Sequence, residues 1–151
     1  MRGLNAAAAA LWLLMSSQAM AETPWEVFVR LGFTGTWTSS CDVPPSLPNM
    51  WYVISKGADG NVYRISNRGP DLPPGTSVID RAEVLTAATI RIHEVSNDPL
   101  DKPHSFDVVL EKANGRVRTL ESTREDGTVL ARDGVNIASG QPTRWIEKCR
   151  D

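Results

Sequence analysis

The feature that most constrains the fold of this chain is a series of short, strand-like segments separated by strong turn signals. Asp-Gly or Asn-Gly dipeptides, which favour tight turns with positive φ, occur at 59–60, 114–115, 126–127 and 133–134. Many short strands divided by such turns favour an antiparallel sandwich or barrel. We expect strands near 35–41, 50–56, 61–67, 77–85, 89–95, 105–112, 116–123, 128–132 and 143–149.

The hairpin around 114–115 allows a test of register. A two-residue turn there pairs Glu111 with Arg118 as an exposed ion pair, and Val109 with Leu120. The opposite face then gathers Phe106, Val108, Leu110 and Val117. The segment 78–85 is less distinct, because its apolar residues also fit a helical stripe.

The beginning of the chain has the pattern of an export signal. A single basic residue, Arg2, precedes an apolar run over 6–15, and an A-x-A cleavage site ends at residue 21. The run is about half of the roughly 20 residues that a membrane-spanning helix needs. We therefore predict a signal peptide over 1–21 and a single β-barrel domain over 22–151. The expected location is the periplasm, or otherwise the medium, with no membrane span in the mature chain.

Charge argues against nucleic acid as a partner. The chain has 16 basic and 18 acidic residues, for a formal net charge of −2, and it has no basic tract. Phosphate contacts need clustered Lys and Arg side chains. Nucleic-acid binding is therefore not expected.

Two cysteines, Cys41 and Cys149, predict one disulfide. An even number of cysteines in an exported chain usually pairs. No C-x-x-C spacing indicates a redox pair, and no neighbouring His or Cys cluster indicates a metal site. In an up-and-down barrel the first and last strands are neighbours, so this bridge would staple the closing seam. A sandwich can also bring these two residues together.

A short helix precedes the first strand and leads to a recognisable motif. Thr23 can cap this helix and Glu26 completes a capping box, with the helix running to about Leu31. The G-x-W that follows, Gly35 to Trp37, resembles the opening motif of lipocalins and related calycin barrels. The resemblance implies an up-and-down barrel of about eight strands in which Trp37 closes the floor.

In that family a basic residue near the end of the barrel packs over the tryptophan, and Arg144 is the matching candidate here. The resemblance therefore implies a cation–π contact between Arg144 and Trp37. The family's T-D-Y motif is absent from this sequence. An eight-stranded barrel is wide enough to be filled by its own side chains or to hold one small ligand.

An aromatic and apolar group around the first hairpin is the candidate ligand-binding site. With a turn at 59–60, Tyr52 and Ile54 share a face with Tyr63 and Ile65, and Trp51 lies beside them. Rings provide contact area and hydroxyls orient a ligand. Simple packing in the core is the alternative interpretation.

Catalytic and metal-binding residues are not expected. His93 alternates outward on its strand and His104 lies in a loop, and nothing places a nucleophile beside either one. Asp98 and Asp101 lack the ordered ligand spacing of a calcium loop. The sequence thus predicts no enzyme, no cofactor and no metal.

Two functions remain. The first is an exported binding module for a small apolar or amphipathic ligand. The second is an envelope protein-interaction factor, or an inhibitor of an exported enzyme, without a small-molecule ligand. Small rigid disulfide-closed barrels with stiff proline-rich loops suit the second role.

Overall fold

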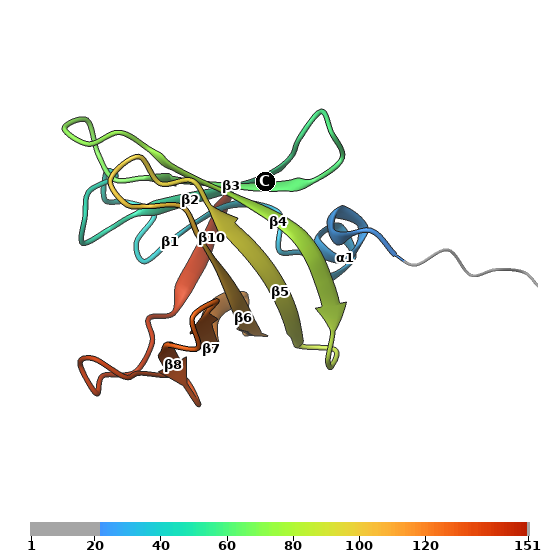
Figure 1. The fold of residues 1–151 in the computed structure, drawn as a ribbon. Helices are drawn as coiled ribbons and strands as arrows, with labels where there is room; N and C mark the ends of the chain where they lie inside the picture. The colour runs from blue at the N-terminus through green and yellow to red at the C-terminus, as the bar shows by residue number, and fades with distance from the viewer. Residues whose placement is uncertain (1–21, 151) are drawn as a thin grey trace, which may run out of the picture.

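The computed structural model of the protein describes residues 22–150, so the predicted signal peptide lies outside the described residues. The chain forms a closed antiparallel barrel of eight strands with one short helix (Figure 1). The expected all-β barrel is confirmed, whereas the division of the chain at residue 21 stays a prediction. Among residues 22–150 there is no helix with the length and apolar character needed to cross a bilayer.

The elements follow the predicted strands to within a few residues, with one additional short strand. They are α1 (Pro24–Leu31), β1 (Gly35–Thr38), β2 (Trp51–Lys56), β3 (Val62–Asn67), β4 (Gly75–Val84), β5 (Thr89–Ser96), β6 (His104–Ala113), β7 (Arg116–Arg124), β8 (Val129–Arg132), β9 (Val135–Asn136) and β10 (Ile146–Arg150).

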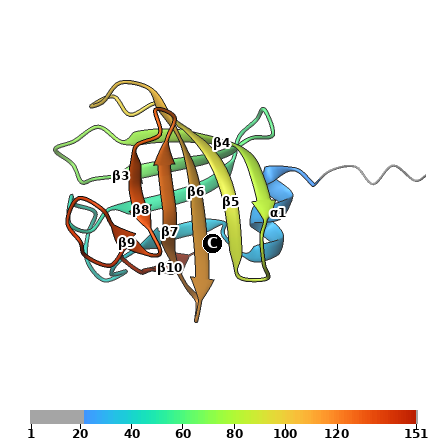
Figure 2. The ribbon, with the colours of Figure 1, turned by 60° about the horizontal axis from the view of Figure 1, so that its bottom comes forward.

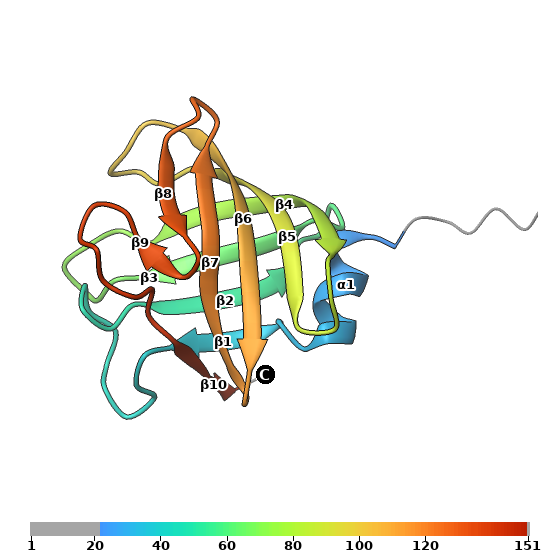
Figure 3. The ribbon, with the colours of Figure 1, turned by 90° about the horizontal axis from the view of Figure 1, so that it is seen from below.

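The sheet runs in chain order from β1 to β9, and β10 closes it. β10 pairs with β1, where Trp37 lies opposite Lys148, and with β7, where Val117 lies opposite Ile146. β8 and β9 continue from β7 beyond the closed ring. Figures 2 and 3 show β1 to β4 crossing behind β5 to β8, with α1 at one end of the barrel.

The helix α1 forms because its ends are satisfied and one face is apolar. The Thr23 side chain and the Glu26 carboxylate form the predicted capping box, and Gly32 ends the helix with φ of 68°. Val27 and Phe28 are buried against the barrel. The helix thereby covers one end of the barrel.

A lysine fixes this cover to the sheet. Lys112 Nζ donates to the carbonyls of Leu31 at 2.8 Å and Gly32 at 3.1 Å, at the carboxyl end of the helix where a cation is favoured. Burial, and to a smaller extent the neighbouring charge of Lys148, lowers the pKa of Lys112. The end of β6 and the end of α1 are therefore held together.

The first strand ends at Thr38, earlier than predicted, because the buried side chain of Asn49 takes the hydrogen bonds of the residues that follow. Asn49 Oδ1 accepts from Thr38 Oγ1 and from the Ser40 amide, both at 3.0 Å. Its Nδ2 donates to the carbonyls of Ser40 at 3.0 Å and Val43 at 2.8 Å. These bonds satisfy backbone groups that a longer strand would have used. Cys41 consequently lies in a turn after β1.

The predicted disulfide between Cys41 and Cys149 is confirmed, with Cα atoms 5.5 Å apart and a sequence separation of 108. Cys149 lies in β10, so the bridge joins the loop after β1 to the last strand. It therefore reinforces the seam at which β1 and β10 meet. Such a bridge fits an oxidising compartment.

The β6–β7 hairpin has the predicted register near its turn and departs from it farther away. Glu111 pairs with Arg118, and their side chains form the expected ion pair at 2.7 Å, but the pair is half-buried and not exposed as predicted. A bulge then shifts the register, so that Val109 lies opposite Glu121 and the predicted pairing with Leu120 is wrong. The ambiguous segment before β5 is a strand, with a bulge between Ile79 and Arg81.

Candidate functional site

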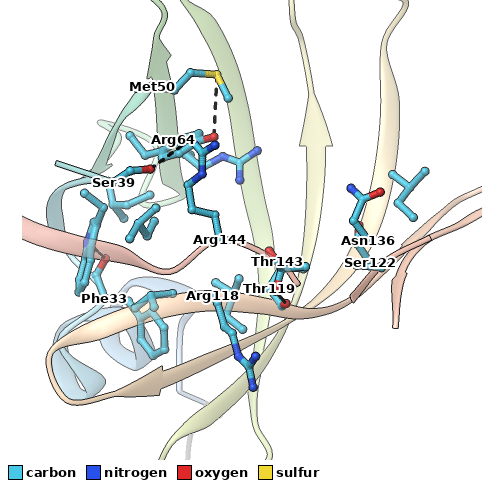
Figure 4. A pocket seen from close by; sticks show the side chains of 18 of the residues that line it. Phe33, Ser39, Met50, Arg64, Arg118, Thr119, Ser122, Asn136, Thr143 and Arg144 are labelled. Atoms are coloured by element: carbon cyan, nitrogen blue, oxygen red, sulfur yellow. Dashed lines mark hydrogen bonds between the residues drawn. The ribbon is translucent and has the colours of Figure 1, made fainter. Parts of the chain in front are cut away.

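A cavity of about 540 Å³ lies inside the barrel and is partly open to solvent. This volume falls within the range of about 300–1,000 Å³ that is typical of small-molecule sites. Figure 4 shows the lining side chains. Its mouth lies between the β1–β2 loop, which contributes Leu47 and Pro48, and the connection to β10, which contributes Thr143 and Arg144.

The wall of the cavity is apolar toward the helix and mixed polar and apolar elsewhere. The apolar part comes from α1, the segment after it, and strands of the ring: Phe28, Phe33, Trp37, Ile54, Leu110 and Val117. The remaining part carries the polar side chains of Ser39, Thr119, Ser122, Asn136 and Thr143 together with the apolar residues Leu47, Pro48, Met50, Leu130 and Ala131. A cavity with this division matches a molecule that has one apolar and one polar part.

Two of the predicted ligand-binding residues line this cavity and two lie on the opposite face of the sheet. Tyr52 and Ile54 line the wall. Tyr63 donates to Asp59 at 2.8 Å outside the barrel, and Ile65 is exposed. The prediction that these four side chains share a face is therefore wrong.

The cause is a shift of one residue in the β2–β3 register. A two-residue turn at 59–60 would have placed Ile54 opposite Ile65, but Ile54 lies opposite Arg64. The connection is longer than the dipeptide implies, since the amide of Gly57 donates to the carbonyl of Asn61. A shift by one residue turns every side chain of a strand to the other face.

Trp51, the fifth residue of the predicted group, also lies outside the cavity. Its Nε1 donates to the Val43 carbonyl at 3.1 Å, and the Arg150 guanidinium lies 5.6 Å from the ring centre. Trp51 thus holds the β1–β2 loop in place and contributes to the mouth only indirectly.

The shifted register places a charged pair inside the barrel. Arg64, which is 34% exposed, forms an ion pair with Glu94, which is 1% exposed. The Arg64 guanidinium also lies 5.4 Å from the centre of the Tyr52 ring. Its Nε is buried and has no hydrogen-bond partner among residues 22–150. A two-residue turn at 59–60 would have placed Arg64 on the outer face, because it shifts the register by one residue.

The cation over Trp37 is not the one that the sequence predicted. Lys148 Nζ lies 5.9 Å from the centre of the Trp37 ring, since β10 places Lys148 directly opposite Trp37. Arg144 precedes β10, and its Nη1 donates to the Pro48 carbonyl and weakly to Ser39 Oγ at 3.5 Å. The implied contact of Arg144 with Trp37 is therefore corrected: Arg144 lies at the mouth.

Tyr52 lies between these charged groups. Burial raises the pKa of the Tyr52 hydroxyl, and the charge of Glu94 raises it further, against the opposing effect of Arg64 and Arg144. The hydroxyl therefore stays protonated at neutral pH and can donate a hydrogen bond. Its acceptor in the structure is the Met50 sulfur at 3.9 Å, which is a weak one.

The third arginine in the wall is occupied elsewhere. Arg118 pairs with Glu111 at 2.7 Å, and its guanidinium lies 4.6 Å from the centre of the Trp145 ring. Figure 4 shows its side chain turned away from Arg64 and Arg144. Arg118 therefore forms part of the cavity wall, and the arginines whose side chains remain available to a ligand are Arg64 and Arg144.

The histidines lie away from the cavity. His93 Nδ1 is 2.7 Å from Asp80 Oδ1, and His104 packs edge-on against Phe106 with ring centres 4.6 Å apart. Across residues 22–150 no group of three or more His, Cys, Asp or Glu side chains is arranged to hold a metal ion. The cavity is therefore the strongest candidate site.

Comparisons with protein-family models, with curated proteins and with solved structures found no match to this chain. The fold and the cavity alone define the class, which is a small disulfide-closed antiparallel barrel with a solvent-open interior.

Proposed function

We propose that this protein is an exported, calycin-like barrel that binds one small amphipathic molecule in its cavity. The observation that carries the proposal is a cavity wall that is apolar at the helix and carries all of its hydroxyl, amide and guanidinium groups in the remaining, mixed part. An apolar segment of a ligand would gain free energy by leaving water, and its polar group would keep hydrogen bonds at the mouth. The proposal includes no catalytic step.

The test uses two matched tryptophan substitutions on β7. Ser122 lines the cavity, whereas its neighbour Thr123 lies on the outer face, opposite the exposed Asp107. Ser122→Trp should fill the cavity, and Thr123→Trp adds the same ring outside it. Native mass spectrometry after incubation with a lipid extract should show bound mass in the wild type and in Thr123→Trp, and none in Ser122→Trp. Bare protein in all three samples would overturn the proposal.

The same measurement tests export. Protein recovered from the envelope of its host should have the mass of a chain that begins at Glu22 and lacks two hydrogens because of the disulfide. A full-length mass that includes residues 1–21 would contradict cleavage at the predicted site.

A second candidate function, binding to an envelope protein or an exported enzyme, is favoured by exposed apolar residues near the mouth. Leu47 is 60% exposed and Ile137 is 53% exposed. Replacement of both by aspartate should abolish capture of a stoichiometric partner from an envelope extract while leaving the thermal midpoint unchanged. Capture that persists in this variant would reject these residues as the contact surface.

A further inference from the structure

We propose that the mouth of the cavity is a subsite for one anionic group of the ligand, held by Arg144 and Arg64 with the Tyr52 hydroxyl. This inference rests on the proposed binding function and specifies the chemistry of the ligand. The molecule would be an amphipathic acid, with its anionic group at the mouth and its apolar part against the helix end.

The first support is the sign of the charges around the cavity. The charged side chains in its wall are Arg64, Arg118 and Arg144, and no carboxylate lines it among the described residues. This excess of cations stands out in a chain whose formal net charge is −2. Electrostatic complementarity therefore selects a negative ligand over a positive one.

The second support is that one of these cations is not neutralised. Glu94 pairs with Arg64 and Glu111 pairs with Arg118. For Arg144, no carboxylate lies within 4.0 Å in residues 22–150, and its partners are neutral oxygens of Pro48 and Ser39. The wall thus carries one uncompensated positive charge, which matches a single negative charge on the ligand.

The third support is that Arg144, Arg64 and Tyr52 have hydrogen-bond donors without a strong protein acceptor. Within residues 22–150, Arg144 donates to protein only through Nη1, and Arg64 has a buried Nε without a partner. In the described part of the chain, the protonated Tyr52 hydroxyl has a single acceptor, the Met50 sulfur. Figure 4 shows Arg64 and Arg144 reaching toward the same part of the cavity. Hydrogen bonds from charged donors to an anion are stronger than those between neutral groups.

The experiment compares three probes that differ only in the head group: decanoate, decanol and decylamine. Isothermal titration calorimetry should show decanoate binding the wild type at least about tenfold more tightly than decanol. Added salt should weaken decanoate binding and leave decanol binding unchanged, because the mouth is open to solvent. Arg144→Gln should weaken decanoate binding about tenfold and leave decanol within about twofold, with Arg144→Lys between them.

Arg132→Gln is the matched control, because Arg132 is exposed on β8 and does not line the cavity. It should leave the affinities for all three probes unchanged. Equal affinity for decanoate and decanol, preference for decylamine, or equal loss of both ligands in Arg144→Gln would overturn the anionic subsite while cavity binding persists. If none of the three probes binds, both the subsite and the proposed binding function are rejected.

Discussion

Replacement of Arg64 by methionine should destabilise the protein more than its partial exposure suggests. The substitution keeps much of the packing of the side chain and removes its charge, which leaves the Glu94 carboxylate 1% exposed without its ion-pair partner. Loss of one member of a buried pair costs about 3–5 kcal/mol. Arg64 is itself 34% exposed, so solvent screens the pair, and we expect the lower end, a loss of about 3 kcal/mol in the free energy of unfolding.

The reverse substitutions distinguish the buried charge from a packing effect. Glu94→Met leaves Arg64 free to turn toward water, so the expected loss is only about 1 kcal/mol. The double variant Arg64→Met/Glu94→Met removes both charges and should recover to within about 1 kcal/mol of the wild type, since apolar pairs often replace buried ion pairs without loss. Urea unfolding followed by tryptophan fluorescence measures all three values.

The control is Arg91→Met, which breaks an ion pair with Glu83 on the outer surface of the same barrel. Exposed pairs of this kind contribute little, so its effect should stay below about 0.5 kcal/mol. Two results would refute the reasoning. The first is a free energy of unfolding for Arg64→Met that is as high as that of Arg91→Met. The second is a double variant whose free energy of unfolding is as low as that of Arg64→Met alone. Either would mean that the Glu94 carboxylate does not depend on Arg64.

Three further predictions concern the framework around the cavity. The double variant Cys41→Ser/Cys149→Ser opens a loop with a sequence separation of 108, and urea unfolding should show a loss of about 4–5 kcal/mol on the chain-entropy model; a loss below about 1 kcal/mol would contradict it. Asn49→Ala removes the hydrogen bonds that end β1, and a loss of about 3 kcal/mol is expected in the same assay. Thr23→Ala removes the helix cap and should cost about 1 kcal/mol, measured as a lower thermal midpoint by circular dichroism; an unchanged midpoint would show that packing alone holds α1.

Most of the architecture followed from local patterns. The capping box of α1 needs only two residues three positions apart, Thr23 and Glu26, and both form the expected bonds. The turn at 114–115 fixes the nearby pairs of its hairpin, including Glu111 with Arg118. Such features could be predicted because the interactions that decide them lie within a few residues of each other in the chain.

The wall of the cavity could be predicted only in part, because it depends on details that the pattern does not encode. The two-residue turn assumed at 59–60 is in fact a longer connection. Because of this difference, Arg64 lies on the inner face of β3, where Tyr63 and Ile65 were predicted. Likewise, the bulge after Val109 has no clear signature in the sequence. Trp37 illustrates a third case, because its cation partner is decided by pairing between distant strands. Long-range register, rather than composition, limited the prediction of the site.

The position of the closing seam has a consequence for the order of folding. β1 can pair with β10 only when nearly the whole chain is present, since Trp37 meets Lys148 there. Contacts between residues so far apart in sequence close late and slowly, because the loop entropy is lost before the contact is made. While the chain is being synthesised, β1 therefore lacks one of its two neighbours. The barrel, and with it the cavity, can close only after the residues of β10 have been synthesised. A truncation before Ile146 would leave an open sheet with a free edge.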